Sequence, residues 1–479
     1  MLSYSMPRDQ NLLPSASSPG VSPRAMAVLR ALIFPYLWVG IALALIVVAS
    51  VYRLQALSLL AFIGVVVALG VIDLRALMTL IYPVYALAGA VASLTVIESG
   101  AYITEQYRFG FNIGASGILA LYAACFLTVA HIWISYWADR MSGRVSRRAT
   151  RVLGLYVVGT SVGSVLFYGV VFLRYGTALS DLTRFAWLAS LPNVLIDAHT
   201  LIRSYIIPVA FALAGILLVV NGWRRSWYVI FLALPLVCLF WAGDKFSGFA
   251  LPLILGCVGV GVGCIYAGVR PRIRLRQFGW IGVLGLLLLG IVAFGYIRSG
   301  AQNAVSAIAD RLALQGHVWF GIFDRLGGAP GVDFFTMVRD NTLSTPSGLD
   351  ALSYLVSDPN FVHERLGRGV TFTMGGPATA LAALGTWGGL IAFSATAFLY
   401  VAVIYGIVRL GYSQMYVPVL VLLCLYLVVG AATQMGYWDA LYSPVALGCY
   451  SLLIICLLAA VGMRRLKSQH EARISMPLD

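Results

Sequence analysis

Residues 417–435 read VPVLVLLCLYLVVGAATQM, an apolar stretch without a charged side chain. A helix rises about 1.5 Å per residue, and the hydrocarbon core of a bilayer is about 30 Å thick. This stretch is therefore long enough to cross a membrane as a helix. Comparable stretches recur along the chain, and we predict spans at 31–51, 56–72, 76–97, 113–135, 152–172, 201–220, 228–242, 249–269, 278–297, 389–409, 417–435 and 443–463.

The composition favours the same fold class. Of 479 residues, 61% are hydrophobic and 10% are charged, and the mean hydropathy is +0.90. A soluble domain carries about 25% charged residues, so much of this apolar surface has to face lipid. We predict an all-α polytopic membrane protein with about twelve transmembrane helices and one large external loop that contains amphipathic helices.

Charge and cysteine content exclude several other classes. The net charge of +14 does not indicate nucleic-acid binding, because the basic residues form short clusters between apolar runs. All seven cysteines fall inside apolar runs and none has a CxxC spacing. We therefore expect neither a disulfide framework nor a metal site.

The basic clusters predict the orientation of the chain, because lysine and arginine accumulate in cytoplasmic loops. With the N-terminus inside, each cluster follows an even-numbered span, which puts both termini in the cytoplasm. The clusters are 140–151, 224–225, 270–276, Arg409 and 464–467. We divide the chain into a disordered cytoplasmic tail (1–24), a bundle of about nine spans (25–297), a large external loop (298–376), about three further spans (377–463) and a cytoplasmic tail (464–479).

The external loop 298–376 holds seven of the eighteen acidic residues and two of the five histidines. A loop of this length in a compact protein is usually functional or disordered, and its apolar periodicity argues against disorder. Residues 302–326 predict an amphipathic helix. Opposite its apolar face, three polar residues recur at intervals of seven: Asp310, His317 and Asp324.

This polar stripe has two interpretations. It is either the solvated face of an interfacial helix, or it is turned toward an aqueous cleft. Gly316 in the middle of the segment weakens the prediction of a continuous helix.

A second charged segment lies near the end of the loop. His363, Glu364, Arg365 and Arg368 fall within six residues, ahead of a Gly-Gly-Pro break at 375–377 that starts a helix. Positive groups beside a helix N-terminus favour anion binding. The alternative is that these residues form a stop-transfer charge cluster. That explanation is weak here, because the charges lie on the predicted external side.

The connection 243–248, GDKFSG, is a tight external turn between two predicted spans. Charges at membrane level are costly unless they are paired or hydrated. Asp244 and Lys245 therefore either pair with each other or have a functional role.

These features discriminate between function classes. An ion-coupled transporter should carry carboxylates or histidines within its spans, and here the spans are almost free of carboxylates. His131 lies in a span, where a single histidine is more often structural. A channel should show polar rings or a filter motif, which are not visible. An enzyme acting on a lipid-linked substrate at the outer leaflet explains the charged loop directly.

The layout resembles the Wzy-type O-antigen and capsular polysaccharide polymerases. These proteins have many spans, a late and large periplasmic loop, and a following span that begins with a short Gly/Pro-rich helix. Here that region reads RGVTFTMGGPATALAALGTWGGLIAF, with Gly388-Gly389 as the small-residue break. The turn GDKFSG lies where the family commonly has a Gly-Ser-Arg turn, with Lys245 at the basic position. The O-antigen ligases share the same general plan.

The resemblance implies a GT-C-type glycosyltransferase in the bacterial inner membrane. The substrate would be an undecaprenyl-diphosphate-linked oligosaccharide, joined to a second such unit by inversion, without a metal or other cofactor. A chain-length regulator and a flippase are the implied protein partners, besides the lipid bilayer and without nucleic acid. The alternatives are an O-antigen-ligase-like glycan transferase and a flippase or transporter of lipid-linked glycans.

The chemistry then assigns roles to the charged loop, which becomes the periplasmic catalytic loop. Cations stabilise a departing diphosphate, and an imidazole or carboxylate accepts the proton of the attacking hydroxyl. The predicted catalytic residues are His317, Arg311, His363 and Glu364. The predicted substrate- and diphosphate-binding residues are Arg298, Arg365, Arg368, Lys245, Asp310 and Asp324.

His317 is the first choice as proton acceptor, because a histidine with a pKa near 6.5 is partly neutral at neutral pH. Asp310 and Asp324 lie about 10 Å away along the helix axis, so neither can orient it. A partner for His317 therefore has to come from elsewhere in the fold. His363 is the second choice.

Overall fold

The computed structural model describes residues 23–141, 147–178, 184–222, 227–244, 246–271, 304–342, 344–367 and 375–474. Before the long loop the helices are α1 (Pro23–Val51), α2 (Gln55–Ile72), α3 (Leu74–Thr79), α4 (Ile81–Glu98), η1 (Thr104–Gln106), α5 (Ala115–Ala138), α6 (Arg147–Tyr175), α7 (Arg184–Ala189), α8 (Asn193–Leu201), η2 (Ile202–Ile206), α9 (Ile207–Asn221), η4 (Trp227–Leu232), α10 (Ala233–Trp241) and α11 (Phe246–Ala267). Two short antiparallel strands, β1 (Tyr102–Ile103) and β2 (Arg108–Phe109), form a hairpin around η1.

The long loop and the region after it contain the remaining elements. They are α13 (Ala304–Leu326), α14 (Phe334–Val338), α15 (Gly348–Val356), α16 (Pro359–Gly367), α17 (Gly376–Ala395), α18 (Ala397–Tyr412), α19 (Tyr416–Gly430), η5 (Ala431–Met435), η6 (Trp438–Tyr442) and α20 (Pro444–Ile474).

The apolar helices confirm a multi-pass, all-α membrane protein. Nine helical segments among the described residues are long and apolar enough to cross a membrane, and Tyr36–Val51 and Val229–Trp241 are shorter apolar helices. Each of these eleven segments coincides with a predicted span. The predicted span 278–297 lies outside the described residues, as does most of the predicted tail 1–24. The total of twelve therefore stays a prediction.

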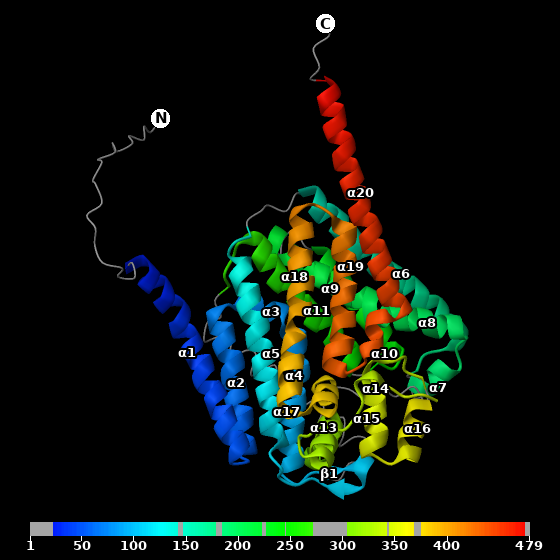
Figure 1. The fold of residues 1–479 in the computed structure, drawn as a ribbon. Coiled ribbons are helices and arrows are strands. Elements are labelled where there is room, and N and C mark those ends of the chain that lie inside the picture. Colours follow the sequence, from blue (N-terminus) through cyan, green and yellow to red (C-terminus); the bar gives the residue numbers. More distant parts are fainter. Residues whose placement is uncertain are drawn as a thin grey trace, which may run out of the picture.

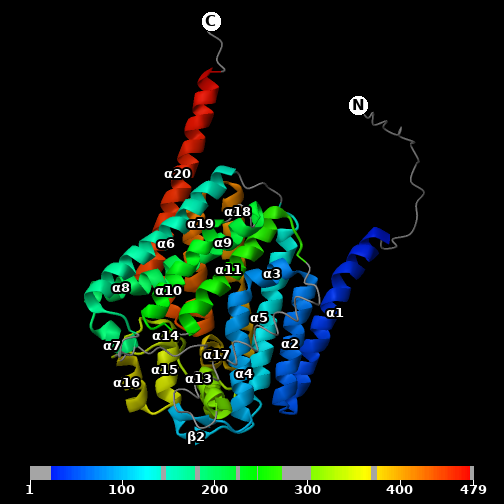
Figure 2. The same cartoon turned by 180° about the vertical axis from the view of Figure 1, so that it is seen from behind.

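The two ends of the bundle differ in character (Figures 1 and 2). The start of α1 and the end of α20 lie toward the upper end in Figure 1, whereas the β1–β2 hairpin and α13, α15 and α16 lie at the lower end. Helix α5 contacts α1, α2, α4, α17 and α18. The connections predicted to be external at 98–112 and within 298–376 thus gather at one end, away from the start of α1 and the end of α20.

An ion-pair network lies at the end of the helical bundle that is near the predicted cytoplasmic clusters of basic residues. Arg75 pairs with Asp73 and Asp139, each at 2.7 Å, and Arg270 pairs with Asp139 at 2.5 Å. His131 lies beside it within α5, where its Nε2 is 3.1 Å from the carbonyl oxygen of Asp73. His131 therefore has the structural contacts expected of a histidine within a span.

Helix α13 is continuous and packs closely on the bundle. A Cβ at Gly316 would come within 2.7 Å of the Ser93 hydroxyl on α4, so the glycine permits a close helix contact rather than a break. Trp319 donates from its indole N–H to the carbonyl of Ala115 at 3.1 Å and packs edge-to-face on Tyr122. These buried contacts dock the amphipathic helix on the start of α5.

Helix α17 breaks at Gly385, and the break predicted at Gly388-Gly389 is wrong in position. Gly385 has φ +70°, and a Cβ there would meet the backbone and ring of Pro330 at 3.0–3.2 Å. The loop after α13 fills the break, because Thr386 donates its backbone N–H to the Gly328 carbonyl at 2.8 Å. The Tyr122 hydroxyl donates to the Thr386 carbonyl at 2.6 Å. The freed backbone groups are thus satisfied by protein rather than by lipid.

Replacing Gly385 with Ala should destabilise the protein by about 1–3 kcal/mol, because the residue needs a left-handed conformation and a close approach to Pro330. Thermal unfolding of the purified protein in detergent measures the effect. Gly388→Ala is the matched control: Gly388 is exposed and has no left-handed backbone, and a Cβ there would meet only the Leu384 Cβ at 3.2 Å, so this variant should lose less stability than Gly385→Ala. Equal losses in the two variants would contradict the assigned position of the break.

Candidate functional site

A buried carboxylate fixes the hairpin between α4 and α5. Glu98, the last residue of α4, accepts hydrogen bonds from the backbone N–H groups of Ile113 and Ala115 at 3.2 and 2.7 Å. Its second oxygen accepts from the N–H and the hydroxyl of Ser116. The first N–H groups of a helix have no partner within it, so the carboxylate satisfies them and complements the positive end of α5. Residues 99–112 are thereby held against the bundle.

The hairpin presents Glu105 to α16. Oε1 of Glu105 lies 3.5 Å from Nη1 of Arg365, and the two side chains are 1% and 30% exposed. The Arg365 guanidinium also lies 4.7 Å from the centroid of the Phe361 ring, which helps to orient it. Oε2 of Glu105 is buried and receives no hydrogen bond from the described residues. A buried carboxylate oxygen without a donor is costly, which marks it as a candidate functional group.

Arg108 joins the same hairpin to α13. Its Nη1 lies 2.7 Å from Oδ2 of Asp324, and its Nε donates to the side-chain oxygen of Gln106 at 2.9 Å. The Gln106 amide in turn donates to the backbone carbonyl of His317 at 2.9 Å. The hairpin therefore packs on the polar stripe between His317 and Asp324, where the Asp324 side chain stays 24% exposed.

His317 is buried within this cluster, with 1% of its surface exposed. Its Nδ1 lies 2.9 Å from the Leu314 carbonyl, and since a carbonyl only accepts, Nδ1 carries the proton and Nε2 presents a lone pair. Burial lowers the pKa of His317; the charge of Glu105 opposes this shift, and that of Arg365 adds to it. Glu105 therefore acts on His317 through its charge, whereas the Leu314 carbonyl holds Nδ1 of the ring.

The other predicted site residues lie at varying distances from this cluster. His363 and Glu364 on α16 are exposed, and the His363 Nδ1 is 3.2 Å from the Tyr354 hydroxyl. Asp310 is exposed on α13. The backbone of Arg311 belongs to α13, and its side chain is outside the described part of the structure. Three predicted anion-binding residues lie outside the described residues: Lys245, Arg298 and Arg368.

An ion pair joins the GDKFSG turn to η2, and the considered pairing of Asp244 with Lys245 lies outside the described residues. Asp244, 2% exposed, accepts from Nε of Arg203 with both carboxylate oxygens at 2.7 and 2.8 Å. Arg203 belongs to η2, a π-helical turn that continues α8 into α9. Arg203 thus compensates the charge of the buried Asp244.

A second polar node joins α15 to the turn before η6. The Asp350 carboxylate accepts from the side chains of Asn341 at 2.7 Å and Tyr437 at 3.2 Å, and burial raises the pKa of Asp350. Beside it, Leu349 donates its N–H to the Gly436 carbonyl at 3.2 Å. This node connects the end of the long loop to the last spans.

The comparisons with known proteins identify one related segment. Residues 342–449 match a family of unknown function (DUF6418), which corresponds to less than a quarter of the 479-residue chain. The matched segment includes Asp350, Arg365 and the α17 break. Neither the curated proteins nor the solved structures contain a match to this chain.

The Glu105–His317–Arg365 cluster has the groups that proton transfer and anion binding require. A neutral imidazole can accept a proton, a carboxylate stabilises the imidazolium that forms, and the half-exposed arginines at the rim, Arg108 and Arg365, can attract an anion. Among the described residues no group of three or more His, Cys, Asp or Glu side chains is arranged to hold a metal ion.

The sequence predictions did not include Glu105, Gln106 or Arg108. A signal was present: Glu105 and Arg108 lie three residues apart in a short connection on the same predicted side as the long loop. Their contacts with α13 and α16 depend on long-range packing and could not be read from that spacing.

The burial of His317 predicts a pH-dependent stability. Its folded pKa is lower than its unfolded value, about 6.5, so the unfolded chain binds more protons between the two values. The free energy of unfolding should therefore fall as the pH is lowered below about 6.5. Thermal unfolding between pH 5 and pH 8 measures this, and His317→Gln should flatten the profile.

His363→Gln is the matched control for this experiment, because His363 is exposed. Its profile should run parallel to that of the wild type. A His317→Gln profile that also runs parallel would show that the imidazole does not carry the expected pH dependence.

Proposed function

We propose that this protein is a membrane glycosyltransferase that polymerises lipid-linked oligosaccharides at the outer face of the bacterial inner membrane. The observation that carries the proposal is the buried Glu105–His317–Arg365 cluster at the end of the bundle formed by the long loop. The composition of the spans and the resemblance to Wzy-type polymerases support the same reaction class.

In the proposed reaction, the acceptor sugar hydroxyl attacks the anomeric carbon of an undecaprenyl-diphosphate-linked glycan. The new C–O bond forms as the bond to the diphosphate breaks, and the leaving diphosphate takes the electron pair. Nε2 of His317, which is buried in this structure, accepts the hydroxyl proton after substrate binding opens the cluster to the acceptor sugar. Since the hydroxyl pKa is far above that of an imidazole, proton transfer accompanies departure of the diphosphate.

Glu105 and the arginines have separate roles in this proposal. The Glu105 charge stabilises the imidazolium of His317 as it forms. Arg365, with Arg108 as a newly assigned neighbour at the rim, stabilises the negative charge on the diphosphate. The remaining proposed anion-binding residues are Arg298, Arg311, Arg368 and Lys245.

The decisive assay supplies purified protein in liposomes with lipid-linked repeat units alone. A polymerase should yield a ladder of longer lipid-linked chains. A ligase would make no product without a lipid A-type acceptor, and a flippase would move the substrate across the bilayer without lengthening it. Either of these outcomes would replace the proposed function.

Within that assay, His317→Gln should slow chain extension by about 10²–10⁴-fold and remove the fall in rate at acid pH. Glu105→Gln should shift that acid limb by about one pH unit or more to lower pH, because His317 loses the charge that favours its protonated form. Asp333→Asn, an exposed carboxylate in the same loop, is the control and should match the wild type. If His317→Gln extended chains at the wild-type rate and with the same fall in rate at acid pH, His317 would not be the proton acceptor.

The proposal also requires residues 298–376 to be periplasmic and both termini to be cytoplasmic. Ser344 is exposed in the long loop, and Ser413 is exposed in the turn between α18 and α19. In spheroplasts, an impermeant maleimide should label Ser344→Cys directly and Ser413→Cys only after lysis. The unsubstituted protein controls for the seven native cysteines. The reverse pattern would invert the topology and exclude a periplasmic site.

A further inference from the structure

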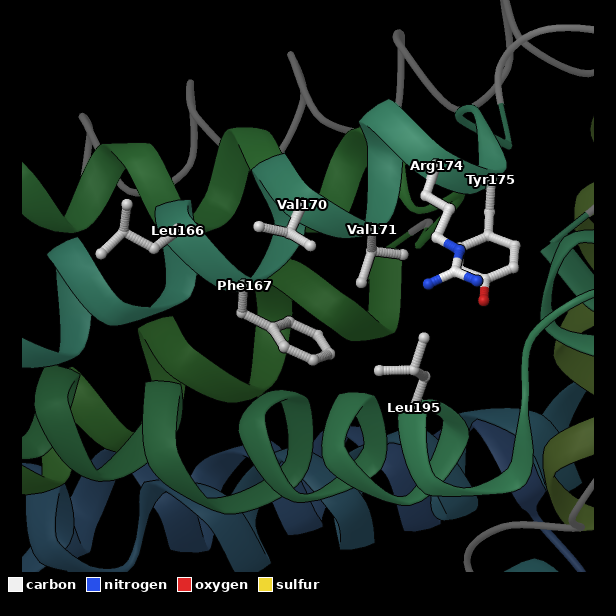
Figure 3. Close-up of a pocket in the computed structure, with 7 residues that line it drawn as sticks. All are labelled: Leu166, Phe167, Val170, Val171, Arg174, Tyr175 and Leu195. Carbon is white, nitrogen blue, oxygen red and sulfur yellow. The ribbon is translucent and has the colours of Figure 1, made fainter.

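A groove lies between α6 and α8, on the side of the bundle formed by the second hydrophobic cluster. It has a volume of about 430 Å³, and its walls come from Phe167, Val170 and Val171 on α6 and Leu195 on α8. In Figure 3, Leu166, Val170 and Val171 follow one another along α6, and Phe167 and Leu195 lie below them. These walls are apolar, which suits a hydrocarbon chain.

The other end of the groove is polar. Arg174 and Tyr175 close it, and the Arg174 guanidinium lies beside the Tyr175 ring, 5.5 Å from its centroid (Figure 3). The Arg174 side chain is exposed, and no carboxylate of the described residues lies within ion-pair distance of it. An arginine in this position offers up to five N–H donors to an anion.

The position of these groups in the span matches the layers of a membrane. Arg174 and Tyr175 are the last two residues of the candidate span Arg151–Tyr175, whereas Leu166 and Val170, both more than 60% exposed, lie one to two turns deeper. Tyrosine and arginine are typical of the headgroup region, and aliphatic side chains of the hydrocarbon region.

We propose that this groove is a binding site for one anionic phospholipid. One acyl chain lies along the apolar walls of α6 and α8, and the headgroup phosphate accepts hydrogen bonds from the Arg174 guanidinium and the Tyr175 hydroxyl. Charge complementarity selects a lipid with net negative charge, because a zwitterionic headgroup adds a cation next to Arg174.

A photoactivatable phosphatidylglycerol analogue in nanodiscs tests the site. Cross-linking followed by peptide mass spectrometry should locate the label on 166–175 or 193–201. Arg174→Gln should reduce this labelling about tenfold, the effect of losing a charge-assisted hydrogen bond. Arg409→Gln, an exposed arginine at the other end of the bundle, should leave it unchanged. Equal labelling of wild type and Arg174→Gln would overturn the proposal.

Substitutions within and outside the groove, and lipids of different charge, test where and how the label binds. Val170→Trp should block labelling by filling the groove, whereas Leu155→Trp, a similarly exposed aliphatic position on α6 outside it, should not. A phosphatidylcholine analogue should label the groove weakly, and equal labelling by both lipids would contradict selection by charge. Displacement of the label by a polyprenyl diphosphate but not by unlabelled phosphatidylglycerol would make the occupant an isoprenoid carrier and overturn the phospholipid assignment.

Discussion

The Glu98 carboxylate at the N-terminus of α5 holds together the part of the structure on which the candidate site depends. It satisfies backbone N–H groups that α5 cannot satisfy itself, and it does so from the last residue of α4. The intervening hairpin is consequently fixed at both ends. Only in that position do Glu105 and Arg108 reach Arg365 on α16 and Asp324 on α13. A short polar connection thus becomes the wall of a buried site.

The bilayer imposes a second constraint, because irregular backbone at membrane depth needs partners from the protein. At Gly385 these partners are the loop after α13 and the Tyr122 hydroxyl. The π-helical turn η2 carries Arg203 onto buried Asp244. At both positions the departure from a regular helix coincides with a contact between distant segments, so these irregularities connect the long loop and the hairpins to the spans.

The proposed chemistry and the proposed lipid site use charge in different surroundings. Around His317, the buried carboxylate of Glu105 lies beside the half-buried Arg365, and the charges of both act on the protonation of the imidazole. At Arg174 the guanidinium is exposed at the end of an apolar groove and acts through a single anionic headgroup. The first arrangement suits proton transfer, and the second suits selective but reversible lipid binding.

Local patterns in the chain were sufficient to predict the membrane class, the positions of the described apolar helices, and the amphipathic helix that carries His317. These features follow from hydrophobic length and periodicity, which the bilayer and the helix repeat dictate residue by residue. Which charges meet depends instead on how the helices pack. Arg108 and Asp324 are 216 residues apart, and Arg203 and Asp244 are 41 residues apart. Burial, packing against distant helices and the glycine contacts at Gly316 and Gly385 select these pairs, and no local pattern encodes them.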